Sequence, residues 1–245
     1  MQTIICMKWG TRYGAEYVNR LLRSIERNTK RPTKLVCFTD DTTGVDEKVD
    51  CQELPPIALP ADLINTPWRK ISVWQSPLKP LTGDVLFLDL DLVITGDLDR
   101  FFDYKPGSYC VIENWTQLGR KIGNTSCFRF PVGKYVEIFD RLIRDPDDVL
   151  TNWRIEQQYI SDLIPEQNFW PAEWCVSFKH NLLPAWPVRL WKPAPFPNKS
   201  SVVAFTGKPD PDEAMIGQWP VKPGQAYKKL YKQLKPVKWI AENWN

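Results

Sequence analysis

Apolar and polar positions at the start of the chain alternate in the manner of an α/β protein. Residues 2–7 and 33–38, QTIICM and TKLVCF, are short apolar runs typical of buried strands. Between them lies a segment whose apolar residues fall on one face of a helix: Val18, Leu21, Leu22 and Ile25. The order strand, helix, strand predicts two parallel strands joined by a right-handed crossover.

The same pattern continues along the chain, where residues 84–94, DVLFLDLDLVI, predict a third continuous strand. Further predicted elements are a helix at 67–76 with a proline in its first turn, strands at 108–113, 126–130 and 200–206, helices at 133–145, 152–164 and 224–234, and a proline-rich loop at 184–197. This alternation predicts a Rossmann-like α/β fold, in which helices cover both faces of a mixed sheet. We assign residues 1–220 to one domain and residues 221–245 to a basic helical tail.

The composition narrows the class of protein. Six cysteines without C-x-x-C spacing and a single histidine argue against a zinc site, so we expect reduced thiols in the core. No apolar run is long enough to span a bilayer and no signal-peptide pattern is present, which favours a cytoplasmic protein. Residues 221–245 hold six lysines and one glutamate, so the net charge of +3 is concentrated in the tail. This distribution is not that of a nucleic-acid-binding protein.

Two carboxylates interrupt the predicted strand at 84–94. Asp89 and Asp91 would share one face of a strand, where like charges repel and the loss of water is costly. A divalent cation, Mn²⁺ or Mg²⁺, would neutralise both and could also hold the phosphates of a substrate. The alternative is that one aspartate caps a turn while the other is solvated. Lys8 and Asp40 follow the first two strands, and ligands in such folds bind beyond the carboxyl ends of parallel strands.

Residues 87–102, FLDLDLVITGDLDRFF, resemble the D-x-D segment of nucleotide-sugar glycosyltransferases with the GT-A fold. The likeness is greatest to the glycogenin and galactosyltransferase group called family 8. The resemblance implies a GT-A fold and a metal ion, held by Asp89 and Asp91, on the diphosphate of a sugar nucleotide. It also implies transfer of the sugar to an acceptor hydroxyl with retention of anomeric configuration, and uridine as the expected nucleoside.

Other segments resemble the same family, in order, over roughly residues 2–212. KWGTRYGAEYVNRLLRSI is similar to the segment that cradles the nucleoside, WRKISVW to a lysine-bearing helix, and VVAFTGKPDP to a glycine loop that closes over the diphosphate. The resemblance therefore implies nucleotide contacts from Lys8, Trp9, Tyr13, Asp40, Lys70, Gly207 and Lys208. GNTSCFRFP and RIEQQYI are similar to the segments that face the sugar. They imply sugar contacts from Asp89, Asn124 and Ser126, and catalytic roles for Glu156 and Gln157.

The chain departs from the family in its late segment. The family usually has a histidine there as a third metal ligand, whereas this chain has Ala204 and Thr206, and its only histidine is His180 in a neighbouring loop. Glu156 also stands where the family has an aspartate. Two alternatives stay open: a sugar nucleotidyltransferase, and a non-catalytic relative that binds carbohydrate or nucleotide.

The expected partners are a nucleotide-sugar donor and a glycan, lipid-linked or protein acceptor, as in polysaccharide biosynthesis. In the tail, Tyr227, Leu230, Tyr231 and Leu234 recur at helical spacing. This spacing predicts an amphipathic helix that either packs on the domain or lies on the anionic inner surface of a membrane.

Overall fold

The computed structural model describes all 245 residues and contains a seven-stranded sheet in the order β3-β2-β1-β4-β7-β6-β8. Its strands are β1 (Gln2–Lys8), β2 (Thr33–Thr39), β3 (Asp50–Glu53), β4 (Asp84–Leu88), β6 (Cys110–Glu113), β7 (Gly123–Pro131) and β8 (Asn168–Phe169). A smaller sheet joins β5 (Leu92–Ile94), β10 (Val202–Ala204) and β9 (Cys175–Ser177). The central sheet is mixed, because β7 runs antiparallel to both of its neighbours.

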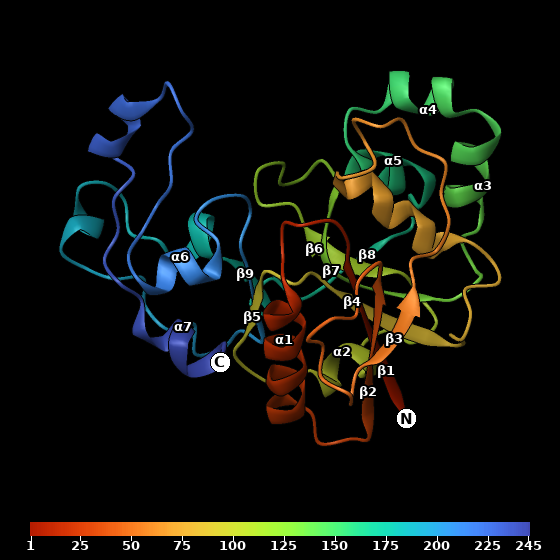
Figure 1. Cartoon of the computed structure of the whole chain (residues 1–245), viewed down its shortest axis with the longest axis horizontal. Helices are drawn as coiled ribbons and strands as arrows, with labels where there is room; N and C mark the ends of the chain where they lie inside the picture. Colours follow the sequence, from red (N-terminus) through yellow and green to blue (C-terminus); the bar gives the residue numbers. More distant parts are fainter.

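Helices lie on both sides of the central sheet (Figure 1). The α-helices are α1 (Ala15–Asn28), α2 (Asp99–Asp103), α3 (Glu137–Arg144), α4 (Pro146–Asn152), α5 (Glu156–Leu163), α6 (Pro211–Met215) and α7 (Lys238–Asn243). Shorter turns are the 3₁₀ helices η1 (Pro67–Trp74), η3 (Val188–Leu190) and η4 (Ala226–Leu230), and the π-helical turn η2 (Phe178–Leu182). None of them combines the length and hydropathy that a membrane span requires.

The predicted β-α-β start and the α/β fold are confirmed. β1 and β2 pair in parallel over their whole length, and α1 connects them. Successive residues of β1 face opposite sides of the sheet, so Ile4 and Cys6 join one hydrophobic core while Ile5 and Met7 join the other. The first core includes α1, and the second includes η1 and α3–α5. The sheet is thus buried on both faces.

The prediction of one continuous strand at 84–94 is wrong. β4 ends at Leu88 and pairs with β1 and β7, whereas β5 begins at Leu92 and pairs with β10 in the smaller sheet. Asp89, Leu90 and Asp91 form the crossing between the two sheets, where the Asp89 amide donates to the Ser126 carbonyl at 2.9 Å. The two aspartates therefore lie at the carboxyl end of β4, beside the ligand-binding edge of an α/β sheet.

Two predicted helices also differ from the structure. The helix at 67–76 is the 3₁₀ helix η1, capped by the Thr66 hydroxyl. The amphipathic helix at 224–234 is reduced to η4, in which Tyr227 is 63% and Leu230 75% exposed. Prolines at 223 and 236 leave twelve residues between them, too few for a stable helix without packing. Only the end of the tail packs, because Trp239, Ile240 and Trp244 are buried in the core that contains α1.

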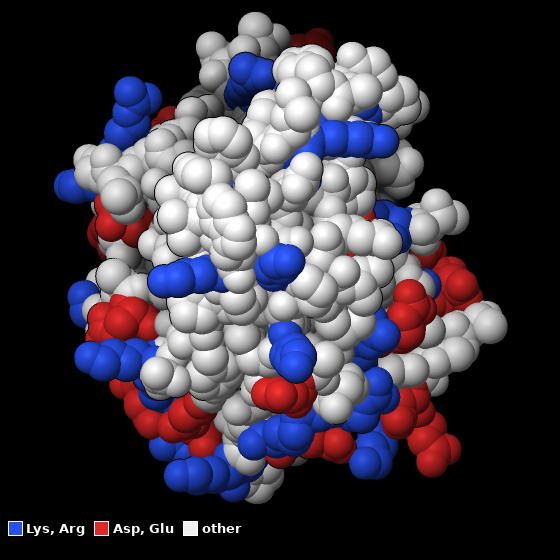
Figure 2. Space-filling view, turned by 90° about the vertical axis from the view of Figure 1, so that its left-hand side faces the viewer, with Lys and Arg blue, Asp and Glu red and all other residues white.

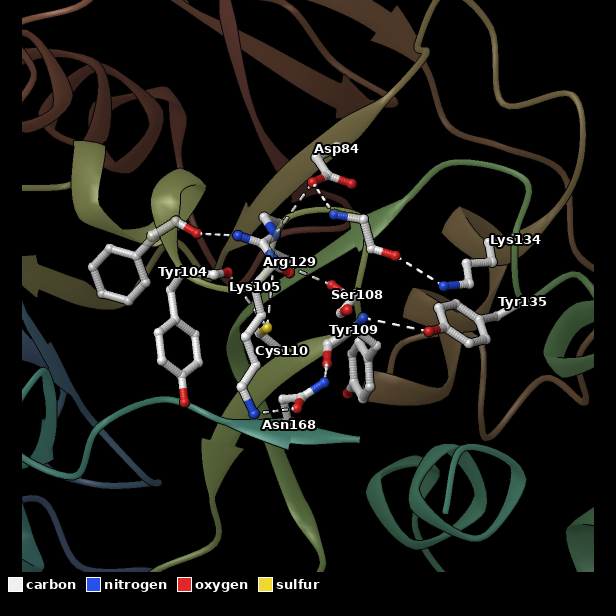
Figure 3. Close-up of polar contacts among 12 residues, drawn as sticks. Asp84, Tyr104, Lys105, Ser108, Tyr109, Cys110, Arg129, Lys134, Tyr135 and Asn168 are labelled. Atoms are coloured by element: carbon white, nitrogen blue, oxygen red, sulfur yellow. Dashed lines mark hydrogen bonds and ion pairs between the residues drawn. The ribbon is translucent and has the colours of Figure 1, made fainter. Parts of the chain in front are cut away.

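A buried arginine anchors the end of β7 that lies away from the D-x-D crossing. Figure 3 shows the Arg129 guanidinium directed into a ring of backbone carbonyls, and the side chain is 0% exposed. It donates to the carbonyls of Phe101, Lys105 and Ser108, and its Nε lies 3.7 Å from Asp84 Oδ2. This cluster fixes β7 between β4 and the loop that follows α2.

Candidate active site

A cavity of about 760 Å³ opens at the carboxyl ends of β1 and β4. Its walls come from residues 9–13 after β1, residues 65–70 at the start of η1, residues 89–91 after β4, residues 114–116 after β6, the start of β7, the start of α5 and residues 205–207 after β10. Most of the predicted site residues line it: Trp9, Tyr13, Lys70, Asp89, Asp91, Asn124, Ser126, Glu156, Gln157 and Gly207. Seven segments of the sequence thus meet at one hollow.

Asp89 is paired with a buried cation. Its Oδ1 lies 2.5 Å from the Nζ of Lys70, which also donates to the Thr125 carbonyl at 3.3 Å. Lys70 comes from η1, is buried at the cavity wall, and its Nζ lies 5.3 Å from the centre of the Phe87 ring. The resemblance predicts Lys70 as a phosphate partner, but in this structure its charge is directed at a carboxylate.

Asp91 has no such cation. Its Oδ2 accepts a hydrogen bond from the Tyr13 hydroxyl at 2.9 Å. Burial, followed by the nearby charge of Asp89, raises the pKa of Asp91 to about 7. Burial and the Asp91 carboxylate likewise raise the pKa of the Tyr13 hydroxyl. Asp91 is thus a buried carboxyl group at the cavity with no cation paired to it.

The donor atoms at this crossing fit a hard divalent cation. Each of the two carboxylates has one oxygen that accepts no hydrogen bond from the protein. The Thr206 hydroxyl lines the cavity and is buried without a hydrogen-bond partner. No group of three His, Cys, Asp or Glu side chains gathers anywhere in the chain, so the protein offers two carboxylates and leaves other positions to substrate and water. Ala204 is buried in β10, and His180 is exposed and does not line the cavity.

The deeper wall is formed by α5 and β7. Glu156 is the first residue of α5 and is only 4% exposed, and burial raises the pKa of its carboxyl group. The Thr125 hydroxyl donates to Glu156 Oε1 at 3.0 Å. Next to it, Asn114 donates to Gln157 Oε1 at 3.0 Å. These hydrogen bonds hold a buried carboxyl group and an amide at the cavity wall.

Lys8, Asp40 and Lys208 do not line the cavity. Lys8 is buried and donates to the Asp41 carbonyl at 2.9 Å. Asp40 accepts from the Gly10 amide at 3.0 Å and so fixes the turn after β1, where Gly10 has φ of +61°. Lys208 is paired with Asp210 at 2.7 Å and with Glu213. All three support the loops around the cavity.

Arg12 is a cavity cation that the sequence analysis missed. It lines the cavity, its side chain is 62% exposed, and its guanidinium lies over the Tyr13 ring at 4.8 Å. Its Nη2 lies 3.6 Å from Asp210 Oδ1, a buried oxygen without a hydrogen-bond partner. Its position beside Tyr13 in TRYG could have indicated it from the sequence.

Asn114 and Trp115 also line the cavity and were missed, because they follow a strand without a distinctive motif.

The mixed sheet with helices on both faces has the GT-A fold, which it shares with solved glycosyltransferases. Galactosyltransferase LgtC, solved with donor and acceptor sugar analogues, superposes with a TM-score of 0.58 at 11% identity over 86% of this chain and 89% of that one. Glycosyltransferase GlyE of Streptococcus pneumoniae TIGR4 gives 0.57 at 13% identity over 86% and 56%. The bifunctional glycosyltransferase WbbM gives 0.57 at 13% over 86% and 46%.

No protein-family model and no curated protein matches the sequence. The fold expected from the resemblance is therefore confirmed by structure alone.

Proposed function

We propose that this protein is a glycosyltransferase that moves a sugar from a nucleotide-sugar donor, with UDP as the expected nucleotide, to an acceptor hydroxyl. The observation that carries the proposal is the shared cavity. The carboxylates of Asp89 and Asp91 lie there with the aromatic rings of Trp9 and Tyr13 and with the buried Glu156. A sugar nucleotide needs a flat surface for its base, a site for its diphosphate and polar groups for its sugar, and these residues supply all three.

At the diphosphate end, Asp89, Asp91 and the Thr206 hydroxyl would hold Mn²⁺ or Mg²⁺. When bound, such an ion offsets the negative charge of the departing diphosphate. Arg12 would hold the donor phosphates from the rim, in the bound donor and in the transition state alike, as its guanidinium can donate two parallel hydrogen bonds to a phosphate. Lys208 can join them only by giving up Asp210 and Glu213. Trp9 and Tyr13 would hold the nucleoside.

At the sugar end, Asn124, Ser126, Glu156 and Gln157 would orient the donor sugar and the reacting carbon. Retention of configuration requires the acceptor oxygen to bond to the anomeric carbon on the face from which the diphosphate leaves. The bond to the diphosphate oxygen breaks, and the acceptor proton passes to that oxygen. In this proposal the Glu156 carboxylate would stabilise positive charge on the anomeric carbon.

The proposal is tested by a thermal-shift screen of nucleotide sugars with and without Mn²⁺, followed by a donor-hydrolysis assay. A ligand that binds only the native state raises the melting temperature, so we expect UDP-sugars with Mn²⁺ to give the largest rise. Binding without turnover would favour a non-catalytic relative. Release of diphosphate from a nucleoside triphosphate and a sugar phosphate would favour a nucleotidyltransferase.

Arg12 gives a second prediction. Arg12→Ala should raise KM for the nucleotide sugar about tenfold and leave kcat nearly unchanged, since it removes a charged hydrogen bond made at the rim. Arg12→Lys should recover part of the loss, because it keeps the charge but not the planar fork. Steady-state kinetics measure both constants. Arg120→Ala, a change of an exposed arginine that does not line the cavity, is the control, and an equal effect there would contradict the role of Arg12.

A further inference from the structure

One side of the molecule leaves large apolar side chains in solvent. Residues 186–192 and 216–232 define this C-terminal face, which lies at the left of Figure 1. Its exposed apolar side chains include Trp186, Trp191, Ile216, Tyr227, Leu230 and Tyr231. Other large exposed apolar side chains, such as Leu118 and Ile143, belong to different parts of the chain. Clustered exposure of this kind marks an interaction surface, whereas scattered apolar residues are ordinary.

The same face carries positive charge alone. Its two segments contain no Asp or Glu, and their basic residues are Arg189, Lys192, Lys222, Lys228, Lys229 and Lys232. Figure 2, which views the molecule from this side, shows blue and white atoms over the middle of the face, with red atoms toward its lower part and margins. A partner of this face should therefore be neutral or negatively charged where the two surfaces meet.

The two segments are joined into one surface. Arg189 donates to the Tyr231 carbonyl at 2.6 Å, and its guanidinium lies over the Trp219 ring at 5.2 Å. The ammonium group of Lys232 lies 5.5 Å from the centre of the same ring. These contacts fix the loop that contains η3 against the loop that contains η4, so the exposed aromatic and basic side chains are presented together.

Not every aromatic residue of the tail that could have met a membrane is exposed. Trp239 and Trp244, which the tail could have offered to a membrane, are buried in the core, and Trp239 donates to the Ala194 carbonyl at 3.0 Å. The end of the tail therefore holds the C-terminal face on the domain. The face itself is made by residues before and after the late strand β10.

We propose that the C-terminal face docks on the surface of an anionic membrane. Tryptophan and tyrosine favour the boundary between headgroups and acyl chains, where leucine and isoleucine can also leave water. Lysines around them are attracted to anionic headgroups. A nucleic acid would match the charge, but its phosphate backbone offers no apolar region to Leu230 and Ile216. The proposal stands apart from the proposed catalytic function, because it uses no residue of the cavity.

The test is co-sedimentation of the full chain with vesicles of phosphatidylcholine alone or with phosphatidylglycerol. We expect binding only to the anionic vesicles, weakened by salt. Lys228→Glu with Lys229→Glu should weaken this binding at least about tenfold, since two attractive charges become repulsive. Trp186→Ser with Trp191→Ser should weaken it similarly by removing the inserted rings, and should do so at every salt concentration.

Matched controls change the same residue types elsewhere. Lys30→Glu with Lys79→Glu makes the same change of net charge at exposed positions, and Ile143→Ser removes an exposed apolar side chain from α3. Both controls should bind like the wild type, and melting temperatures confirm that every variant is folded. Equal binding to neutral vesicles, no binding to anionic ones, or equal loss in the controls would overturn the proposal. So would retention of a nucleic acid or an acidic protein in place of vesicles.

Discussion

Asp91→Asn should lower metal-dependent turnover of the nucleotide sugar about a thousandfold. The Asp91 oxygen that accepts no hydrogen bond from the protein is replaced by an amide nitrogen, while the remaining oxygen can still accept from the Tyr13 hydroxyl. Without metal, the variant should melt at or above the wild-type temperature, because the repulsion between Asp89 and Asp91 is gone. Donor hydrolysis as a function of Mn²⁺ concentration measures the activity, and calorimetry with Mn²⁺ alone measures the site.

Asp147→Asn provides the control, since Asp147 is exposed on α4, away from the cavity. It should retain full activity and wild-type affinity for Mn²⁺. The metal assignment would be contradicted by undiminished turnover in Asp91→Asn, or by wild-type turnover in excess EDTA. In the second case Lys70 and Arg12 would remain as the cations available to a diphosphate.

The local pattern of apolar residues was enough to predict the first helix and strands of the fold. The spacing of Val18, Leu21 and Ile25 depends on residues within one helix, and the alternation in β1 depends on neighbours in sequence. The break at Asp89–Asp91 depends instead on a partner far along the chain, because β5 leaves the central sheet to pair with β10. The residues of β5 are as apolar as those of β4, so no local pattern separates the two strands.

The candidate site divides in the same way. Residue types at a strand end indicated Asp89 and Asp91, whereas Glu156, at the start of α5, was indicated only by the family resemblance; all three line one cavity. The partners of the long basic side chains could not be predicted from the sequence. Lys208 is drawn to Asp210 and Glu213, and Lys70 to Asp89, by acids whose proximity exists only in the folded chain. For the same reason Arg12, exposed and without a motif, was recognised only from the structure.

The second large effect concerns stability. Arg129→Met should lower the free energy of unfolding by roughly 3 kcal/mol, because it removes the buried donor of several carbonyls and an unpaired buried group costs about 1–3 kcal/mol. Methionine resembles the apolar stem of arginine in size and shape. Replacing both partners of a buried ion pair by apolar residues can leave stability unchanged. Here, however, the carbonyls of Phe101, Lys105 and Ser108 would remain buried or half-buried without their donor, and each unpaired group adds its own cost. The loss of hydrogen bonds should therefore outweigh the gain in apolar burial.

Urea unfolding followed by circular dichroism gives the free energy, and the matched variant is Arg31→Met. Arg31 also forms an ion pair, with Asp103 at 2.7 Å, but both side chains are about half exposed, so water can replace the contact and little change is expected. Equal stability of the two variants would show that the Arg129 cluster in Figure 3 adds no more than a surface contact. A loss confined to Arg129→Met would show that β7, which carries Asn124 and Ser126 to the cavity, is held from its opposite end.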